Sequence, residues 1–200
     1  MIRVMIAGML GGVMLITNLS DRCSYLEKAL REIEKTIYNM PYSLQETTEG
    51  YELILYDGER QEVFSMVYPK EPWVYEIGEG VFEVGFSTGS PARYTFYFRQ
   101  EDGKLTDGFS NAKVFGGQYI AYRTWDGGQW DAPLILTDIF GEGILYQEIY
   151  RNFSVTADPM SSIYGIELTD EEHVMLKYCE GEDYTVVNEV VEIEKTSSLQ

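Results

Sequence analysis

A two-residue hydrophobic period runs through most of this chain from residue 51 onward and restricts it to folds built from β-strands. The period is carried by segments rich in Val, Ile, Tyr and Phe at residues 51–56, 61–68, 73–77, 81–87 and 92–99. Glycine, proline and aspartate separate these segments and favour turns between them. Phe82, Val84 and Phe86 alternate with polar or small residues, so each strand is expected to have one apolar face. The sequence therefore predicts an antiparallel sheet with one side in water.

The same pattern continues to the C-terminal part of the chain. Further strands are expected at residues 118–124, 134–139, 144–150, 163–168, 173–178 and 184–193. Short strands at regular spacing are typical of antiparallel sandwiches and barrels. We therefore expect a mainly β fold over residues 50–194, an antiparallel sheet or meander that is sandwich-like or barrel-like, with residues 195–200 as a C-terminal tail.

A weak internal repeat gives an alternative arrangement. Residues 76–111, 112–154 and 155–194 each contain a strand, an acidic glycine-containing turn and a second strand. Each of these segments is about forty residues long, which is the period of a propeller blade. A small propeller-like repeat of units of about forty residues is therefore the alternative to a general antiparallel sheet.

The N-terminal residues resemble an export signal. Met1-Ile2-Arg3 supplies one positive charge, and thirteen residues without a charged side chain follow from Val4 to Ile16. As a helix, this segment would span about 20 Å, which is short of the roughly 30 Å hydrocarbon core of a bilayer. Residues 1–22 are therefore predicted to be a signal peptide or N-terminal hydrophobic leader. The protein is predicted to be extracytoplasmic, either secreted or associated with the cell envelope, and to contact a membrane only through this leader.

One amphipathic helix is expected after the leader, over residues 23–40. Ser24-Tyr25-Leu26-Glu27 fits a capping box, and it is followed by apolar residues at helical spacing as far as Ile37. Pro41 then ends the helix. The apolar stripe indicates a helix that packs on a sheet.

Charge excludes some partners and favours others. The chain has 33 acidic and 15 basic residues, a net charge of −18, which repels nucleic-acid phosphates. The glycines near Gly8 lack the G-x-G-x-x-G spacing of a dinucleotide site, so no nucleotide is expected either. Residues 155–200 hold eleven acids against two lysines, and this field favours a basic protein partner.

The residue types present favour binding over catalysis. The chain has one histidine, His173, and two cysteines, and it has no recognisable nucleophile motif or phosphate loop. We therefore predict a non-catalytic binding or interaction module. Carboxylates are numerous, so a carboxylate-based glycan hydrolase stays open as the enzymatic alternative.

The segment from Trp125 to Asp131 is the most distinctive candidate for ligand binding. Trp125, Asp126, Trp130 and Asp131 lie around a glycine pair. Flat aromatic faces and carboxylates together suit a sugar ring, so an envelope glycan is the alternative ligand to a basic protein. The other interpretation is a hairpin tip whose tryptophans pack back on the sheet.

Two further sites are open from the sequence. Cys23 and Cys179 can form a disulfide if the chain is exported and Cys23 remains after cleavage, or they can stay unpaired. No cofactor is expected, although acidic turns can bind Ca²⁺ weakly outside the cell. The acids of these turns are Asp102, Asp126, Asp131, Glu142, Glu180, Glu182 and Asp183.

Several motifs resemble a group of uncharacterised exported or lipoprotein-like proteins of Gram-positive bacteria. They lie between residues 75 and 194 and comprise Ala92-Arg93-Tyr94-Thr95-Phe96-Tyr97-Phe98 with Gly103-Lys104, Leu136-Thr137-Asp138-Ile139-Phe140, Arg151-Asn152-Phe153-Ser154 and Tyr178-Cys179-Glu180-Gly181-Glu182-Asp183-Tyr184. The group has no assigned activity, so the resemblance implies an envelope location and no functional residues. Members often carry a lipobox cysteine, whereas Ser20 and Arg22 stand here where Leu and a small residue are expected.

Overall fold

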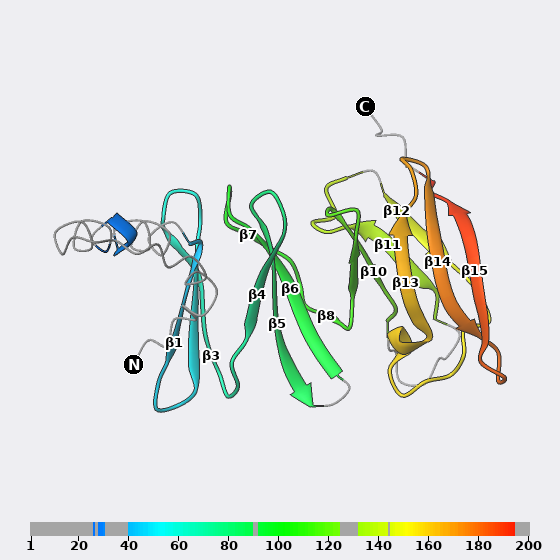
Figure 1. Cartoon of the computed structure of the whole chain (residues 1–200), viewed down its shortest axis with the longest axis horizontal. Helices are drawn as coiled ribbons and strands as arrows, with labels where there is room; N and C mark the ends of the chain where they lie inside the picture. The colour runs from blue at the N-terminus through cyan, green and yellow to red at the C-terminus, as the bar shows by residue number, and fades with distance from the viewer. Residues whose placement is uncertain are drawn as a thin grey trace, which may run out of the picture. The chain divides into compact units, whose positions relative to one another are not determined.

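The computed structural model describes residues 40–89, 92–124, 132–143 and 145–194, together with residue 26 and residues 28–30 (Figure 1). The chain divides into two compact units, Met1–Met40 and Pro41–Gln200. In the first unit the described residues 26 and 28–30 are helical, as predicted. The rest of the predicted helix over residues 23–40, the predicted leader at 1–22 and the tail at 195–200 lie outside the described residues, apart from Met40.

The second unit is built from short strands and one turn of 3-10 helix. In the described part of the chain these elements are β1 (Tyr42–Glu46), β2 (Tyr51–Tyr56), β3 (Glu62–Tyr68), β4 (Trp73–Gly78), β5 (Val81–Gly89), β6 (Ala92–Arg99), β7 (Lys104–Leu105), β8 (Phe109–Ser110), β9 (Lys113–Phe115), β10 (Tyr119–Tyr122), β11 (Leu134–Asp138), β12 (Tyr146–Ile149), η1 (Pro159–Ser162), β13 (Ile163–Leu168), β14 (His173–Glu180) and β15 (Thr185–Glu192).

The strands form four antiparallel sheets that follow one another along the chain. The first sheet is β1-β2-β3, the second is β4-β5-β6-β7 with β8 also paired to β6, the third is β9-β10-β11-β12 and the fourth is β13-β14-β15. Within each sheet, paired strands are consecutive in sequence, apart from β8, which pairs with β6; this is the topology of a meander. None of these sheets closes on itself in the described residues. The predicted antiparallel sheet or meander is confirmed; of the two forms expected for it, sandwich-like or barrel-like, a closed barrel is not among the described sheets.

The predicted forty-residue segments correspond to individual sheets. Segments 76–111, 112–154 and 155–194 contain most or all of the second, third and fourth sheets respectively. A unit of this length holds three to five short strands and the turns between them, so each repeat is one sheet.

Among the described residues, the core lies in three clusters of apolar side chains. The first and second sheets meet through residues that include Leu53, Leu55 and Phe98. Tyr97 of the second sheet packs in a cluster with Ile120 of the third sheet. A third cluster joins the other face of the third sheet to the fourth sheet and includes Leu136. The described sheets therefore pack face to face in chain order.

The expectation that one side of the sheet faces water is wrong for the second sheet. Phe96, Tyr97 and Phe98 are consecutive residues of β6, and all three are buried. Because neighbouring side chains on a strand point to opposite faces, this strand is covered on both sides. The sequence shows an aromatic residue at every position from Phe96 to Phe98, which is the pattern of a strand buried on both faces.

Two glycines allow aromatic rings to lie directly against the backbone. A Cβ atom at Gly85 would overlap the indole ring of Trp73, and one at Gly108 would overlap the ring of Tyr94. Any other residue at these positions would displace the ring.

We found no helix in the described residues that is long and apolar enough to cross a membrane.

Candidate functional site

The outer face of the fourth sheet is the first candidate for binding. Val174, Leu176 and Tyr178 of β14 point into the core and are at most 2% exposed. Their neighbours on β14 and β15 point away from the core, and they include Met175, Lys177, Cys179, Val186, Asn188 and Val190. Val186 is 61% exposed and Val190 is 55% exposed. We call this surface the outer face of the fourth sheet. Its two valines lie on either side of the paired residues Lys177 and Asn188.

Uncompensated negative charge lies at both ends of this face. Two exposed acids, Glu171 and Glu172, lie in the turn between β13 and β14. Glu182 and Asp183 lie in the turn between β14 and β15, where they are also exposed. None of these four side chains forms an ion pair with another residue of the described chain. The face therefore carries exposed valines on both sides of the Lys177–Asn188 pair, and acids at its ends.

Three other acids near this sheet do have partners. Glu167 accepts a 2.6 Å ion pair from Lys177, and Glu189 accepts one of 2.8 Å from Arg151. Asp170 lies 2.8 Å from the Nδ1 atom of His173. These contacts do not involve Glu171, Glu172, Glu182 or Asp183, so those four acids form no ion pair in the described chain.

His173 is a surface residue in a local contact. Its hydrogen bond with Asp170 raises the pKa of the imidazole above its usual range. Cys179 lies six residues further along the same strand, about 20 Å away at the rise of a β-strand. The histidine and the cysteine therefore do not form a catalytic pair within the described chain.

Trp125, Asp126, Trp130 and Asp131 lie outside the described residues, so the predicted glycan site stays a prediction. Hydrogen bonds from Arg123 nevertheless join the residues on either side of this segment. Its guanidinium donates from Nε and Nη2 to the carbonyl oxygen of Ala132, at 3.0 and 2.9 Å. A residue two positions before the segment is thus hydrogen-bonded to the residue directly after it.

Arg123 also connects this position to η1 and to Phe153, which precede the fourth sheet. The side chain is buried, donates from Nη1 to the carbonyl of Pro159 at 3.0 Å, and lies over the ring of Phe153. Burial lowers the pKa of the guanidinium from its usual value. Sequence reasoning missed this residue, because a single arginine between a strand and a loop carries no pattern.

The predicted disulfide stays a prediction. Cys179 lies half-buried on the outer face of the fourth sheet and has no disulfide partner in the described chain. Cys23 is outside the described residues. The prediction that Cys179 lies on the face opposite to Val174 and Leu176 is confirmed.

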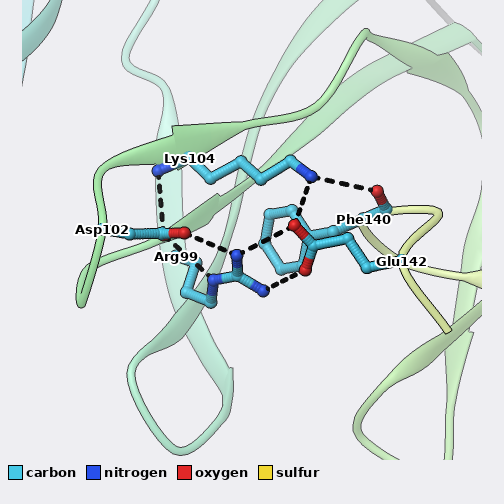
Figure 2. Close-up of polar contacts among 5 residues, drawn as sticks. All are labelled: Arg99, Asp102, Lys104, Phe140 and Glu142. Atoms are coloured by element: carbon cyan, nitrogen blue, oxygen red, sulfur yellow. Dashed lines mark hydrogen bonds and ion pairs between the residues drawn. The ribbon is translucent and has the colours of Figure 1, made fainter.

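Two of the acids predicted as weak calcium ligands are paired with cations instead (Figure 2). Arg99 bonds Asp102 through Nε and Nη2 at 3.0 and 2.6 Å, and Glu142 through Nη1 and Nη2 at 2.6 and 3.2 Å. Lys104 also reaches Glu142, at 2.5 Å. The guanidinium lies 4.6 Å from the ring centre of Phe140. This cluster links the second sheet to the loop that follows β11 in the third.

The same contacts change the acidity of both carboxyl groups. Hydrogen bonds from Arg99 lower the pKa of Asp102 and of Glu142 to about 2. In the described residues, no three side chains of the types that bind metals lie together as a group. Weak calcium binding at the remaining acidic turns stays a prediction.

Sequence reasoning also missed a cluster of exposed tyrosines on β12. The hydroxyls of Tyr146 and Tyr150 both donate to Glu148, at 2.9 and 2.7 Å, and both rings are exposed. These bonds lower the pKa of Glu148 and raise the pKa values of the two tyrosines. The signal in the sequence is the spacing of two, which places Tyr146 and Glu148 on one side of the strand and brings Tyr150 next to them. We call these three residues the tyrosine platform.

A groove with aromatic walls lies between the first and second sheets. Its volume is about 270 Å³, and β3, β5 and β6 together with the loop after β7 form its walls. The rings of Tyr68 and Phe86 lie 4.8 Å apart, and those of Phe86 and Tyr94 lie 5.4 Å apart. We call this feature the aromatic groove. Four separate segments form it, so no local sequence pattern marks it.

Comparison of the chain with protein-family models, with curated proteins and with solved structures gives no match. The resemblance to exported proteins of Gram-positive bacteria therefore stays a prediction, and function has to be argued from the residues themselves.

Proposed function

We propose that this protein is a non-catalytic interaction module of the cell envelope that binds a basic protein partner on the outer face of the fourth sheet. The observation that carries this proposal is the combination of exposed Val186 and Val190 with the unpaired acids of the two adjoining turns. Exposed apolar patches with a polar rim are typical of protein-binding surfaces. The extracytoplasmic location is part of the proposal and is supported by the residues of the N-terminal leader.

The charges indicate which kind of partner fits. A second copy of this chain would place the acids of one outer face against the acids of the other, and like charges facing each other are unfavourable. A partner with Lys and Arg around an apolar centre would instead neutralise both ends of the face. Attraction between such surfaces accelerates encounter at low salt and weakens as salt rises.

The test uses the full chain as bait on solubilised cell envelope, together with two variants of equal charge. In the first variant, Glu171→Gln, Glu182→Gln and Asp183→Asn neutralise the ends of the outer face. In the control, Glu46→Gln, Glu49→Gln and Glu62→Gln remove the same charge from exposed positions of the first sheet and its β1–β2 turn.

We expect the wild type and the control to retain a stoichiometric basic protein that is released as salt rises, and the outer-face variant to lose it. Equal retention by the two variants would refute the proposed surface. Retention that does not depend on salt would refute the electrostatic part of the proposal.

The tyrosine platform favours glycan binding as a second candidate function. Two exposed rings held by one carboxylate offer flat faces and hydrogen-bonding groups to a sugar. In this case Tyr146→Ala with Tyr150→Ala should abolish retention of the chain on envelope polysaccharide, and raised salt should not. Release of reducing ends from that polysaccharide would instead support the glycan hydrolase.

A further inference from the structure

We propose that the aromatic groove binds an organic cation that carries a quaternary ammonium group. This site is separate from the outer face of the fourth sheet, and different observations support it. It lies between β3 and the second sheet, and its volume of about 270 Å³ suits a small headgroup rather than a folded protein segment.

The walls of the groove offer aromatic faces and edges in several orientations. The Phe64 and Phe96 rings lie 5.1 Å apart at an interplanar angle of 51°, and Phe86 is tilted against both Tyr68 and Tyr94. The negative face of an aromatic ring attracts a cation, and groups of such rings recognise quaternary ammonium ligands. An anion placed in the same groove would be repelled by the ring faces.

The charge on the walls of the groove is negative. Among the described residues that line it, Asp107 is the one charged residue. The whole chain carries −18, so a cation is attracted from solution as well as inside the groove.

Hydrogen bonding selects the type of cation. A primary ammonium has three N–H donors, and each needs an acceptor when it leaves water. The groove offers it one carboxylate, that of Asp107, among otherwise largely apolar side chains. A quaternary ammonium has no N–H donor, so it loses no hydrogen bonds on entering this groove.

The wall that carries Asp107 is held in place by the backbone. Thr106 donates its N–H to the carbonyl of Tyr97 at 3.0 Å, and its hydroxyl oxygen accepts the N–H of Tyr97 at 3.0 Å. The next residue but one, Gly108, lies against the ring of Tyr94. The hydrogen bonds to β6 position the loop that carries Asp107, and the Tyr94 ring packs directly on Gly108. Groups held in place before binding lose less entropy when a ligand binds.

The experiment is isothermal calorimetry on the full chain with three probes. The probes are choline, its neutral carbon isostere 3,3-dimethylbutan-1-ol, and ethanolamine as the primary ammonium. We expect choline to bind and each of the other two to bind at least about tenfold more weakly, equivalent to about 1.4 kcal/mol. Absence of choline binding, or equal binding of the neutral isostere, would overturn the proposal. Tighter binding of ethanolamine than of choline would overturn the choice of a quaternary cation.

Variants locate the binding site. Tyr94→Leu and Asp107→Asn should each weaken choline binding several-fold, whereas Glu59→Gln removes one charge from an exposed turn of the first sheet and should leave it unchanged. Gly108→Ala displaces the Tyr94 ring and should weaken binding in the same direction. Thermal unfolding of each variant serves as the control for a retained fold. Unchanged affinity in both Tyr94→Leu and Asp107→Asn would refute the site, whatever the outcome for the basic partner.

Discussion

Replacement of Tyr68 by Phe should make this protein more stable. The Tyr68 side chain is 3% exposed, and its hydroxyl has no hydrogen-bond partner in the described chain. Burial raises the pKa of this phenol to about 12, which is consistent with a polar group removed from water. A buried hydroxyl without a partner costs about 1–3 kcal/mol. Because Phe keeps the ring contact with Phe86 and removes only the hydroxyl, we expect the free energy of unfolding to rise by about 1 kcal/mol.

A second tyrosine supplies the matched control. The hydroxyl of Tyr184 donates to the carbonyl of Val155 at 2.7 Å, and its ring is exposed. Tyr184→Phe loses this bond and should lower the free energy of unfolding by about 0.5–1.5 kcal/mol. The two substitutions remove the same atom and have opposite expected signs.

Urea unfolding followed by tyrosine and tryptophan fluorescence measures both changes. For a chain of this length, 1 kcal/mol corresponds to a shift of about 2–4 °C in Tm, so calorimetry can check the result. A lower stability of Tyr68→Phe, at an unchanged dependence on urea, would show that the hydroxyl has a partner in the folded protein and would refute the reasoning.

Two more predictions follow from burial and charge. Leu136→Ala should lower the free energy of unfolding by about 3–4 kcal/mol, measured with urea, because Leu136 is fully buried. Val190→Ala on the outer face should lower it by well under 1 kcal/mol. Equal losses would contradict the assignment of faces. Arg99 lowers the pKa of Glu142 to about 2, so the stabilisation from Glu142 is present above its unfolded pKa of about 4.5 and is lost as the pH falls through 2. Wild type and Glu142→Gln should therefore differ in stability at pH 6 and converge near pH 2, and a constant difference across that range would disprove the pairing.

Most of the strands could be predicted from the sequence, because their hydrophobic period is a local property. Residues 51–56, 92–99 and 163–168 were predicted with the bounds that β2, β6 and β13 have in the structure. β1 was missed because Tyr42 and Leu44 are its only apolar residues. β7, β8 and β9 have two or three residues each, which is too short to show a period.

Which faces of the sheets are buried could not be predicted from the alternation alone. In β6 a period of two puts Tyr94, Phe96 and Phe98 on one face, and this leaves Tyr97 on the face expected to lie in water. Tyr97 is fully buried because the third sheet packs on that side through Ile120. Packing between sheets depends on residues far apart in the chain, so it is invisible to a period of two.

The same reason limits what the sequence shows of the sites. Arg99 and Glu142 are 43 residues apart, and the loop carrying Asp107 meets Phe64 of β3 only in the folded chain. The sequence did indicate the concentration of acids in the last quarter of the chain. It did not show that the acids of two turns lie at the ends of one sheet with exposed valines between them.

Methyl NMR on the full chain tests the proposed interaction surface most directly. The chain is labelled at its valine and leucine methyl groups and titrated with the basic protein recovered from the cell envelope. We predict that the resonances of Val186 and Val190 shift or broaden at low salt and recover as salt is raised, while those of the buried Leu136 stay unchanged. Shifts confined to the first and second sheets, with Val186 and Val190 unaffected, would contradict the proposal that the outer face of the fourth sheet binds the partner.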